Sequence, residues 1–511
     1  MEKSREMKKS IRKIPATMAT QHPDHANRPY WQKDAFIPTL KEAEECFLCF
    51  SDLGISEYKW DWEGKLVDES VLERLLAEHF QYFKDQPLGQ KKFLTFRLPN
   101  PKVETEFRLG RALMGMLTAA SLARQAELHT PPMFEVILPM TESAEEMIDI
   151  QEAFAEVANL KHRLYNHEKN ALKHIEIVPL FESVQNIAES DRILEDYLRL
   201  HKWKFGFVPQ YMRPYVARSD PALNSGLVPT VLAIKIALSR YRQFEEKHKI
   251  KLFPVIGVGT LPFRGSLNPL RINDFIKEYK GIRTAIIQSA FRYDFPKDKV
   301  KAAIARLDKQ LPQGQAKLIP ADEIQKLLEL IRPFETAYQK TVEKIAPLVN
   351  QVAAHLPKRR ERVLHTGLFG YNRGVGKVRL PRAISYTAAL YSLGVPPELI
   401  GTGRGLKLAA EKHGVKLIKK YYLNLKTDMQ AAGNYLSRGV LKELAKNHLE
   451  WTQVQEDVKS IERALSIKLG PKTREQKEHA RLSELIHKKL LKNKNPQREI
   501  EKAALLRRSM G

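Results

Sequence analysis

Between residues 57 and 288 the chain contains seven short runs of apolar, β-branched and aromatic residues, each followed by polar or charged positions. These runs lie at 57–61, 93–97, 134–138, 175–181, 205–208, 252–258 and 284–288. Helix-like stretches such as 104–127 and 143–159 lie between them, and successive runs begin roughly 30 to 45 residues apart, as expected of βα units. This repetition predicts an α/β fold, a parallel (βα)₈ barrel of the TIM type with additional helices.

An eighth strand is needed to close such a barrel. The best candidate lies at 382–387 (RAISYT), after a long helical insertion near 321–355, and beyond Gly394 the pattern is largely helical. We therefore expect an N-terminal segment with a catalytic loop at 1–56 and the barrel at 57–405. A C-terminal helical region packed on the barrel should follow at 406–511.

Composition narrows the class of protein. Hydrophobic residues make up 43% of the chain, which is enough for a packed core. No apolar run reaches the roughly 18 residues of a membrane span, so no membrane association is expected. Only two cysteines, Cys46 and Cys49, occur, which excludes a disulfide framework and leads us to expect a cytoplasmic protein. In the segment ECFLCF both cysteines read as the apolar face of a helix.

The net charge of +25 raises the alternative of a basic scaffold that binds nucleic acid. Many of the cations lie in the last forty residues, where they alternate with Glu and Leu in a helical pattern (REIEKAALLRRSMG). No aromatic residues that could stack on bases lie among them. The pattern therefore favours a solvated helical face over a nucleic-acid contact.

In a parallel barrel the active site lies at the carboxyl ends of the strands, so the residues that end each run are the candidates for chemistry. They are Asp61, Glu63, Lys65, Arg97, Glu182, Arg213, Arg218, Asp220, Arg264, Arg292 and Asp294. Acids and arginines that converge on one rim suit a metal ion together with a multiply charged anion.

Three of the candidates suit proton transfer and metal binding. His22 lies in a proline-flanked loop (MATQHPDHANRPYW), and histidine suits a general base because its proton affinity lies near neutral pH. A histidine that only packs in a loop is the commoner case. Glu182 and Asp220 end neighbouring runs and could hold one Mg²⁺, an ion that prefers few protein oxygens. The alternative is helix capping, in which Ser183 or Asp220 would start the next helix.

Three arginines, Arg97, Arg264 and Arg292, each end an apolar run close to a proline or glycine. A guanidinium group offers a fork of donors that matches phosphate and carboxylate oxygens. Surface salt bridges are the alternative, but arginines at three separate strand ends favour an anion site.

Several segments together resemble one family. They are IPATMATQHPDHANRPYW, WDWEGK, FRLPNP, VPLFES, YVARSDPALNSG, QSAFRYDFP and AISYTAALYSLGVPPELIGTG. In this order they are similar to the archaeal-type phosphoenolpyruvate carboxylases, from about Ile14 to Arg404. A length near five hundred residues also fits that type, and not the much longer bacterial and plant enzymes.

The resemblance implies an enzyme that is a carbon–carbon lyase. Phosphoenolpyruvate and bicarbonate would react through carboxyphosphate and an enolate to give oxaloacetate and phosphate, with Mg²⁺, or Mn²⁺, as the cofactor. A homotetramer and a role in anaplerotic carbon fixation are also implied. Many relatives are inhibited by aspartate or malate.

The resemblance also implies roles for individual residues. His22 matches the histidine that takes the proton of carboxyphosphate. Glu182 and Asp220 match the two metal-binding acids. Arg264, in FRGS, resembles the arginine of a glycine-rich loop that promotes carboxylation.

Four further arginines would bind substrate. Arg97 and Arg292 resemble phosphate-binding arginines, and Arg373 in GYNRG is a weaker candidate for the same site. The longer relatives carry a lysine three residues after the metal-binding aspartate, where this chain has Leu223. Arg218 could take the place of that lysine.

Two other functions remain open on the sequence. One is a different metal-dependent barrel lyase, such as an aldolase, that acts through an enolate. The other is the basic nucleic-acid-binding scaffold, which the absence of interleaved aromatic residues argues against. A carboxylase differs from both in requiring bicarbonate.

Overall fold

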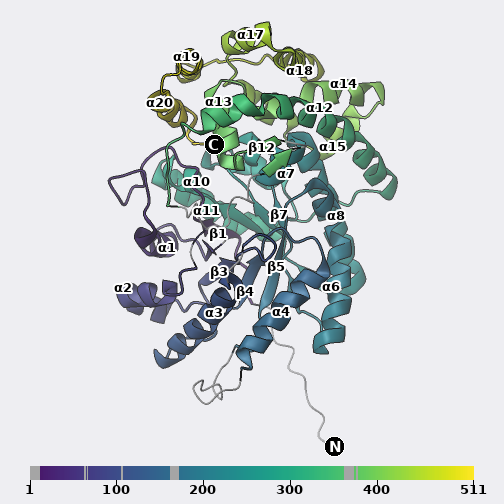
Figure 1. Cartoon of the computed structure of the whole chain (residues 1–511). Coiled ribbons are helices and arrows are strands. Elements are labelled where there is room, and N and C mark those ends of the chain that lie inside the picture. Colours follow the sequence, from purple (N-terminus) through teal and green to yellow (C-terminus); the bar gives the residue numbers. More distant parts are fainter. Residues whose placement is uncertain are drawn as a thin grey trace, which may run out of the picture.

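Eight parallel strands form a closed barrel at the centre of the molecule (Figure 1). The computed structural model describes residues 12–62, 65, 67–104, 107–160, 172–361, 373–375 and 378–511. The barrel strands are β1 (Thr17–Thr20), β2 (Glu57–Asp61), β3 (Phe93–Arg97), β4 (Glu135–Leu138), β5 (Glu176–Phe181), β7 (Tyr215–Ala217), β9 (Val255–Gly257) and β10 (Thr284–Ile287). Neighbours follow the chain order, and β1 closes the barrel between β10 and β2. The predicted (βα)₈ fold is confirmed.

Two of the predicted strands are wrong. Residues 382–387 begin helix α13 (Ala383–Ser392), and the eighth strand is β1, which lies inside the segment expected to precede the barrel. β1 has only four residues, all buried, so its run of TMAT carries little apolar signal. Residues 205–208 end helix α6 (Ser190–Phe205) at Gly206, whose left-handed backbone stops the helix. The barrel strand in that unit is β7.

The barrel interior is a packed apolar core. It is closed at the amino ends of the strands by a cluster of charged residues, which we call the charged floor. Side chains from six strands form an apolar cluster: Met18, Ile137, Val178, Leu180, Tyr215, Ala217, Val255 and Ile286. At the amino ends of the strands, Arg213 pairs with Glu57 at 2.7 Å and with Glu135 at 2.5 Å. Arg213, expected at the active-site end, therefore lies at the opposite end of the barrel, because it precedes β7 instead of following a strand.

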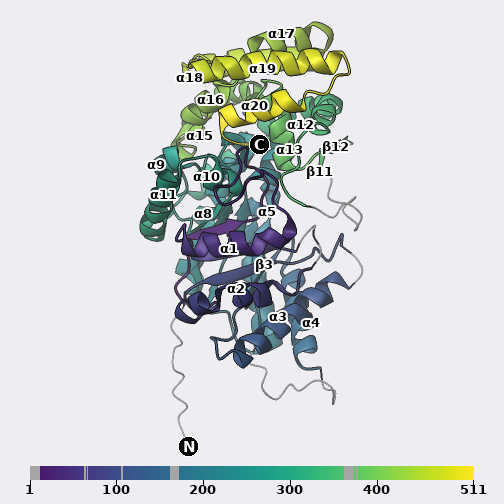
Figure 2. The same cartoon turned by 90° about the vertical axis from the view of Figure 1, so that its left-hand side faces the viewer.

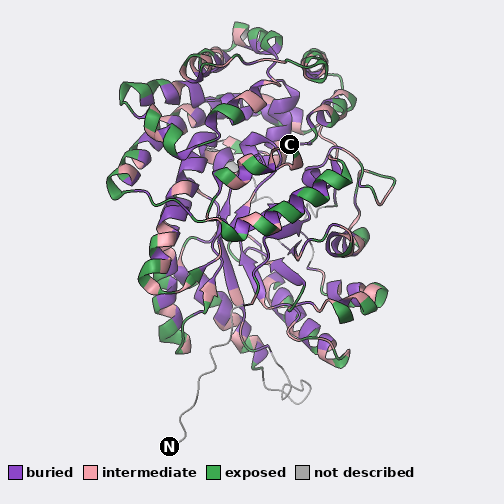
Figure 3. Cartoon of the chain, turned by 180° about the vertical axis from the view of Figure 1, so that it is seen from behind, coloured by how far each residue is buried: buried purple, intermediate pink, exposed green. Residues whose placement is uncertain are grey.

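Helices surround the barrel, with buried faces turned inward and exposed faces outward (Figure 3). They include α1 (Glu42–Ser51), α2 (Val71–Asp85), α3 (Arg108–Gln125), α4 (Ala144–Ala158), α5 (Val184–Ala188), α7 (Ser219–Ser225), α8 (Leu227–His248), α9 (Ile272–Glu278), α10 (Ser289–Tyr293) and α11 (Lys297–Gln310). The helix expected at 143–159 is α4, which begins where the Ser143 hydroxyl accepts a hydrogen bond from the Glu146 backbone N–H. Helix α1 buries both Cys46 and Cys49, as expected.

The C-terminal region is helical, as predicted, and lies over the carboxyl end of the barrel (Figures 1 and 2). After the long α12 (Ala321–Ala353) and α13 come α14 (Thr402–Glu411), α15 (Val415–Tyr421), α16 (Leu425–Gly433), α17 (Arg438–Asn447), α18 (Leu449–Leu465), α19 (Arg474–Leu491) and α20 (Gln497–Arg507). Helices α12 and α13 both contact α7, which directly follows β7. In the described part of the chain, no helix is both long and apolar enough to cross a membrane.

Candidate active site

The mouth of the barrel, meaning the carboxyl ends of its strands and the residues that follow them, gathers most of the predicted chemistry. Its charged and proton-accepting side chains are His22 after β1, Lys59 and Asp61 on β2, Arg97 on β3, Glu182 after β5, Asp220 on α7 and Arg264 after β9. They come from six separate parts of the chain, and only the closed barrel brings them together.

His22 is fixed by the residue two positions before it. Its Nδ1 lies 3.0 Å from the Thr20 hydroxyl. Burial lowers the pKa of His22 well below its ordinary value, and the positive charge of Lys59 lowers it further, while Asp61 opposes the shift. The positive charges of Arg97 and Arg264 lower the pKa of the ring as well. His22 is therefore held in its neutral form.

The segment that carries His22 is clamped to the far side of the mouth. The Asp24 carboxylate accepts hydrogen bonds from the Ala290 N–H at 2.8 Å and from Arg264 Nη1 at 3.2 Å. Asp294 accepts from the backbone N–H groups of Ala26 and Asn27 at 2.8 and 2.7 Å. These bonds tie the loop after β1 to α10 and so fix the position of His22.

Arg264 is fully buried in a tight loop after β9. Its guanidinium donates to the Ser219 hydroxyl at 3.1 Å and to a backbone oxygen of Gly511 at 2.6 Å. The loop needs Gly265, whose φ of 121° lies in the left-handed region and where a Cβ would approach Val258 to 2.4 Å. Burial lowers the pKa of Arg264, while Asp24 and Asp220 raise it, so Asp220 lies near this guanidinium.

Glu182 and Asp220 lie on the same side of the mouth. The two acids follow β5 and β7, which are paired neighbours in the barrel. Burial raises the pKa of Tyr215, Arg97 lowers it, and the charges of Asp61, Glu182 and Asp220 each raise it further. Glu182 also accepts from the Met140 N–H at 2.9 Å. The capping alternative is confirmed for Ser183, whose hydroxyl caps α5, and is not confirmed for Asp220, because the start of α7 has no side-chain cap.

The donor set of Glu182 and Asp220 fits a hard divalent cation such as Mg²⁺, which binds through one or two carboxylates and keeps water or substrate oxygens. Among the described residues there is no group of three or more His, Cys, Asp or Glu side chains that could hold a metal. The chain would thus supply two acids, and substrate and water the remaining ligands.

Two of the expected substrate-binding arginines, Arg218 and Arg292, have their guanidinium groups held by protein oxygens. Arg218 donates to the backbone oxygens of Pro262 and Phe263 and to the Tyr279 hydroxyl, so it supports the loop of Arg264. Arg292 is buried behind the mouth, 2.7 Å from Glu45, and donates to the Ile287 carbonyl oxygen. Both guanidinium groups bind protein oxygens in this structure, and the substrate-binding role expected of them stays a prediction. The side chain of Arg373 lies outside the described residues, as does Glu63.

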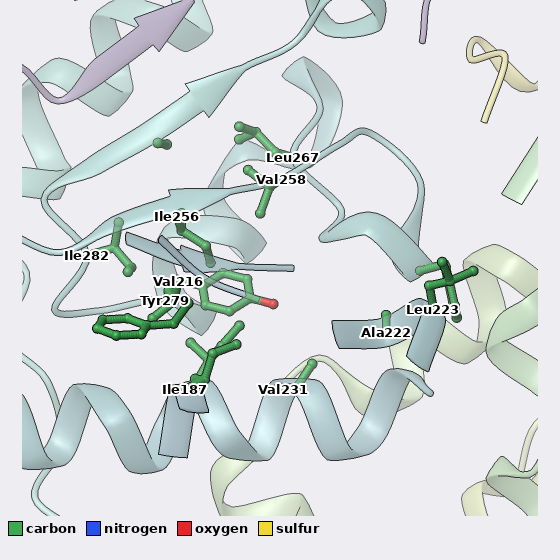
Figure 4. Packing of buried hydrophobic residues seen from close by; sticks show 14 of the residues in the cluster. Ile187, Val216, Ala222, Leu223, Val231, Ile256, Val258, Leu267, Tyr279 and Ile282 are labelled. Atoms are coloured by element: carbon green, nitrogen blue, oxygen red, sulfur yellow. The ribbon is translucent and has the colours of Figure 1, made fainter. Parts of the chain in front are cut away.

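Leu223 does not face the mouth. It is fully buried in the hydrophobic core and projects from α7 beside Ala222 (Figure 4).

The prediction also missed Lys59 and Tyr215, which enter the mouth from within strands. The alternation of charge at Glu57, Lys59 and Asp61 is the signal that would have shown Lys59, since alternate residues of a strand share one face.

Arg97 does lie at the mouth, where its Nε donates to Asp61 Oδ1 at 2.8 Å. A separate surface groove of about 740 Å³ runs between α12 and α14 and contains none of the predicted site residues. The chemistry is therefore concentrated at the barrel mouth.

Comparison with known proteins shows the family to which the chain belongs. The family model described as phosphoenolpyruvate carboxylase matches residues 14–511. The phosphoenolpyruvate carboxylase of Leuconostoc mesenteroides is 38% identical over 92% of this chain and 94% of its own length. Those of Oenococcus oeni and Metallosphaera sedula are each 37% identical and cover 99% and 98% of this chain, with all of their own length matched. The chain belongs to the archaeal-type phosphoenolpyruvate carboxylase family.

Proposed function

We propose that the barrel mouth carboxylates phosphoenolpyruvate with bicarbonate to give oxaloacetate and phosphate. The observation that supports this most is the convergence of His22, Arg264 and the Glu182–Asp220 pair on one end of the barrel. Proton acceptor, anion-binding guanidinium and metal-binding acids are the groups that this carbon–carbon lyase reaction needs. A nucleic-acid scaffold would need none of them.

Arg97 and Arg264 bind the phosphoryl group. They reach the mouth from β3 and from the loop after β9, which lie on different sides of the barrel, so they contact the group from two directions. Fixed guanidinium donors stabilise the charge that spreads over the phosphoryl oxygens during transfer. Transfer to a bicarbonate oxygen forms carboxyphosphate and leaves the enolate of pyruvate.

His22 accepts the proton of carboxyphosphate. The C–O bond to the phosphate then breaks, which yields CO₂ and inorganic phosphate, and the enolate carbon attacks the CO₂ to form oxaloacetate. A neutral imidazole is required for this step, and burial, together with the positive charge of Lys59, keeps His22 in that form. The C-terminal helices over the mouth limit the access of water, which would otherwise protonate the enolate.

Glu182 and Asp220 hold a divalent metal ion, which we propose to be Mg²⁺. When bound, the ion supplies positive charge for the phosphate and enolate oxygens. Removal of the metal with EDTA should abolish activity, and Mg²⁺ should restore it.

The direct test is the formation of oxaloacetate from phosphoenolpyruvate, coupled to malate dehydrogenase and NADH. We expect activity that requires bicarbonate, and equal activity in CO₂-depleted buffer would reject the proposal in favour of a different enolate lyase.

The family resemblance further suggests a homotetramer, for which light scattering should give four times the chain mass of 58.8 kDa.

A further inference from the structure

Strand β2 carries three charged residues on its inner face. Glu57, Lys59 and Asp61 alternate with Tyr58 and Trp60, whose rings join the outer hydrophobic core. Since alternate residues of a strand point to the same side, the three charges form a column inside the barrel. Glu57 belongs to the charged floor and Asp61 to the mouth, which leaves Lys59 between them.

The Lys59 side chain is 1% exposed. Its Nζ lies 3.4 Å from Asp61 Oδ1, the oxygen that also accepts from Arg97 at 2.8 Å. The same Nζ lies 6.0 Å from the centre of the Tyr215 ring, which reaches across from β7. Two cations therefore converge on a single carboxylate oxygen at the mouth.

The order of strands divides the mouth into two halves. Around the closed barrel the order is β1, β10, β9, β7, β5, β4, β3 and β2, so β1 and β2 lie opposite β5 and β7. Glu182 and Asp220, the metal-binding acids, follow β5 and β7. His22 follows β1, and Lys59 lies on the adjacent β2. Arg97 and Arg264 enter from the two sides between these halves.

A substrate that spans the mouth would thus meet different chemistry at each end. The enolate end faces the metal-binding half and the phosphoryl group lies between the two arginines. The half that contains His22 then receives the group that loses a proton, which is the carboxyl group derived from bicarbonate. Lys59 is a buried cation of this half, and among the charges around His22 its charge lowers the pKa of the ring the most.

We propose that Lys59 is the bicarbonate-binding residue of this enzyme, with its ammonium group contacting an oxygen of bicarbonate and then of the carboxyl group of carboxyphosphate. The inference rests on the proposed function. Lys59 keeps its own proton throughout, so it transfers nothing and serves as a fixed positive charge. A preorganised cation of this kind lowers the cost of bringing a second anion beside phosphoenolpyruvate.

The test compares Lys59→Met, which removes the charge and keeps the length, with Lys59→Arg, which keeps the charge. We expect Lys59→Met to raise the KM for bicarbonate about tenfold or more, as befits a lost charge-assisted hydrogen bond. The KM for phosphoenolpyruvate should change less than about threefold, since the phosphoryl group is bound by other residues. Lys59→Arg should recover much of the bicarbonate affinity.

A matched control is Lys92→Met. Lys92 is also a buried lysine, but it donates to the Ile55 carbonyl oxygen at 2.9 Å and precedes β3, at the opposite end of the barrel. Its loss should lower the melting temperature and leave the KM for bicarbonate unchanged. Should Lys59→Met be too unstable to assay, Lys59→Gln carries the same test with a polar side chain.

The outcomes separate the two proposals. If the unaltered enzyme forms no oxaloacetate, the proposed function fails. If that enzyme is active and removal of the Lys59 charge leaves the KM for bicarbonate within about twofold, or raises both KM values equally, Lys59 is a structural residue and the inference is overturned.

Discussion

Replacement of Arg213 by methionine should destabilise the fold without reaching the active site. Arg213 is 1% exposed and binds Glu57 through both Nη atoms, at 2.7 Å each, and Glu135 through one of them. It also donates to the Thr284 hydroxyl at 3.2 Å. These contacts join β2, β4 and β10 at the floor of the barrel, so the substitution leaves two buried carboxylates without their shared cation.

The magnitude follows from Glu135. Burial raises the pKa of this carboxyl group, but Arg12 and Arg213 outweigh burial and lower the pKa from 4.5 to about 2. At 1.36 kcal/mol per unit, the shift corresponds to about 3 kcal/mol of stability, which the two arginines supply jointly. Arg213→Met also leaves the buried Glu57 carboxylate without its cation. We therefore expect the free energy of unfolding to fall by roughly 3–5 kcal/mol, the usual result of removing one partner of a buried ion pair.

The assay is urea denaturation at several pH values, with Lys102→Met as the control. Lys102 forms a pair with Glu142 that is exposed on both sides, so its loss should cost less than about 1 kcal/mol. Because the pKa of Glu135 is depressed on folding, its contribution is complete above pH 4.5 and is lost as the pH falls toward 2. The deficit of Arg213→Met should therefore shrink over that interval.

Two results would refute this reasoning. One is a deficit at pH 7 no larger than that of the Lys102 control. The other is a deficit that stays constant between pH 4.5 and 3, since the ion pairs with Glu135 would then contribute nothing measurable.

Three further predictions concern the mouth and its surroundings. His22→Asn should lower oxaloacetate formation by about a hundredfold or more, while phosphoenolpyruvate binding, measured by fluorescence titration, persists. Asp220→Asn should raise the Mg²⁺ concentration needed for half of the full activity about tenfold, whereas the control Asp191→Asn on α6 should leave it unchanged. An unchanged Mg²⁺ requirement in Asp220→Asn would remove Asp220 from the metal site. Arg292→Met should lower the melting temperature, because Arg292 loses its ion pair with Glu45. The KM for phosphoenolpyruvate should stay within about threefold of that of the unaltered enzyme. A larger rise in that KM would place Arg292 in the substrate site.

The fold was largely predictable because most barrel strands have a strong local signal. The runs at 57–61 and 93–97 coincide with β2 and β3 to the residue, and the helix at 143–159 is bounded by its own cap. β1 was missed because a strand of four residues, with threonine at both ends, lacks an apolar pattern and is fixed by its pairing with β10 and β2. Pairing partners distant in sequence cannot be read from local periodicity.

The candidate site was predictable where a residue directly follows a strand. Arg97 ends β3 and Glu182 follows β5, and both lie at the mouth. Arg292 stands in a similar place in the sequence, yet α10 turns its guanidinium toward Glu45 on α1. The direction of a side chain in such a short helix depends on the tertiary partners it meets. Lys59 was not predicted because it lies within a strand, whereas the candidates were taken from the residues that follow strands.

The central claim is that this barrel mouth makes carboxyphosphate from bicarbonate, and oxygen labelling tests it most directly. The unaltered enzyme is supplied with phosphoenolpyruvate and bicarbonate in which all oxygens are ¹⁸O, and the released phosphate is analysed by mass spectrometry. Transfer of the phosphoryl group to a bicarbonate oxygen predicts a single ¹⁸O atom in each phosphate. Phosphate without the label would mean that water or another group accepts the phosphoryl group, and would contradict the mechanism.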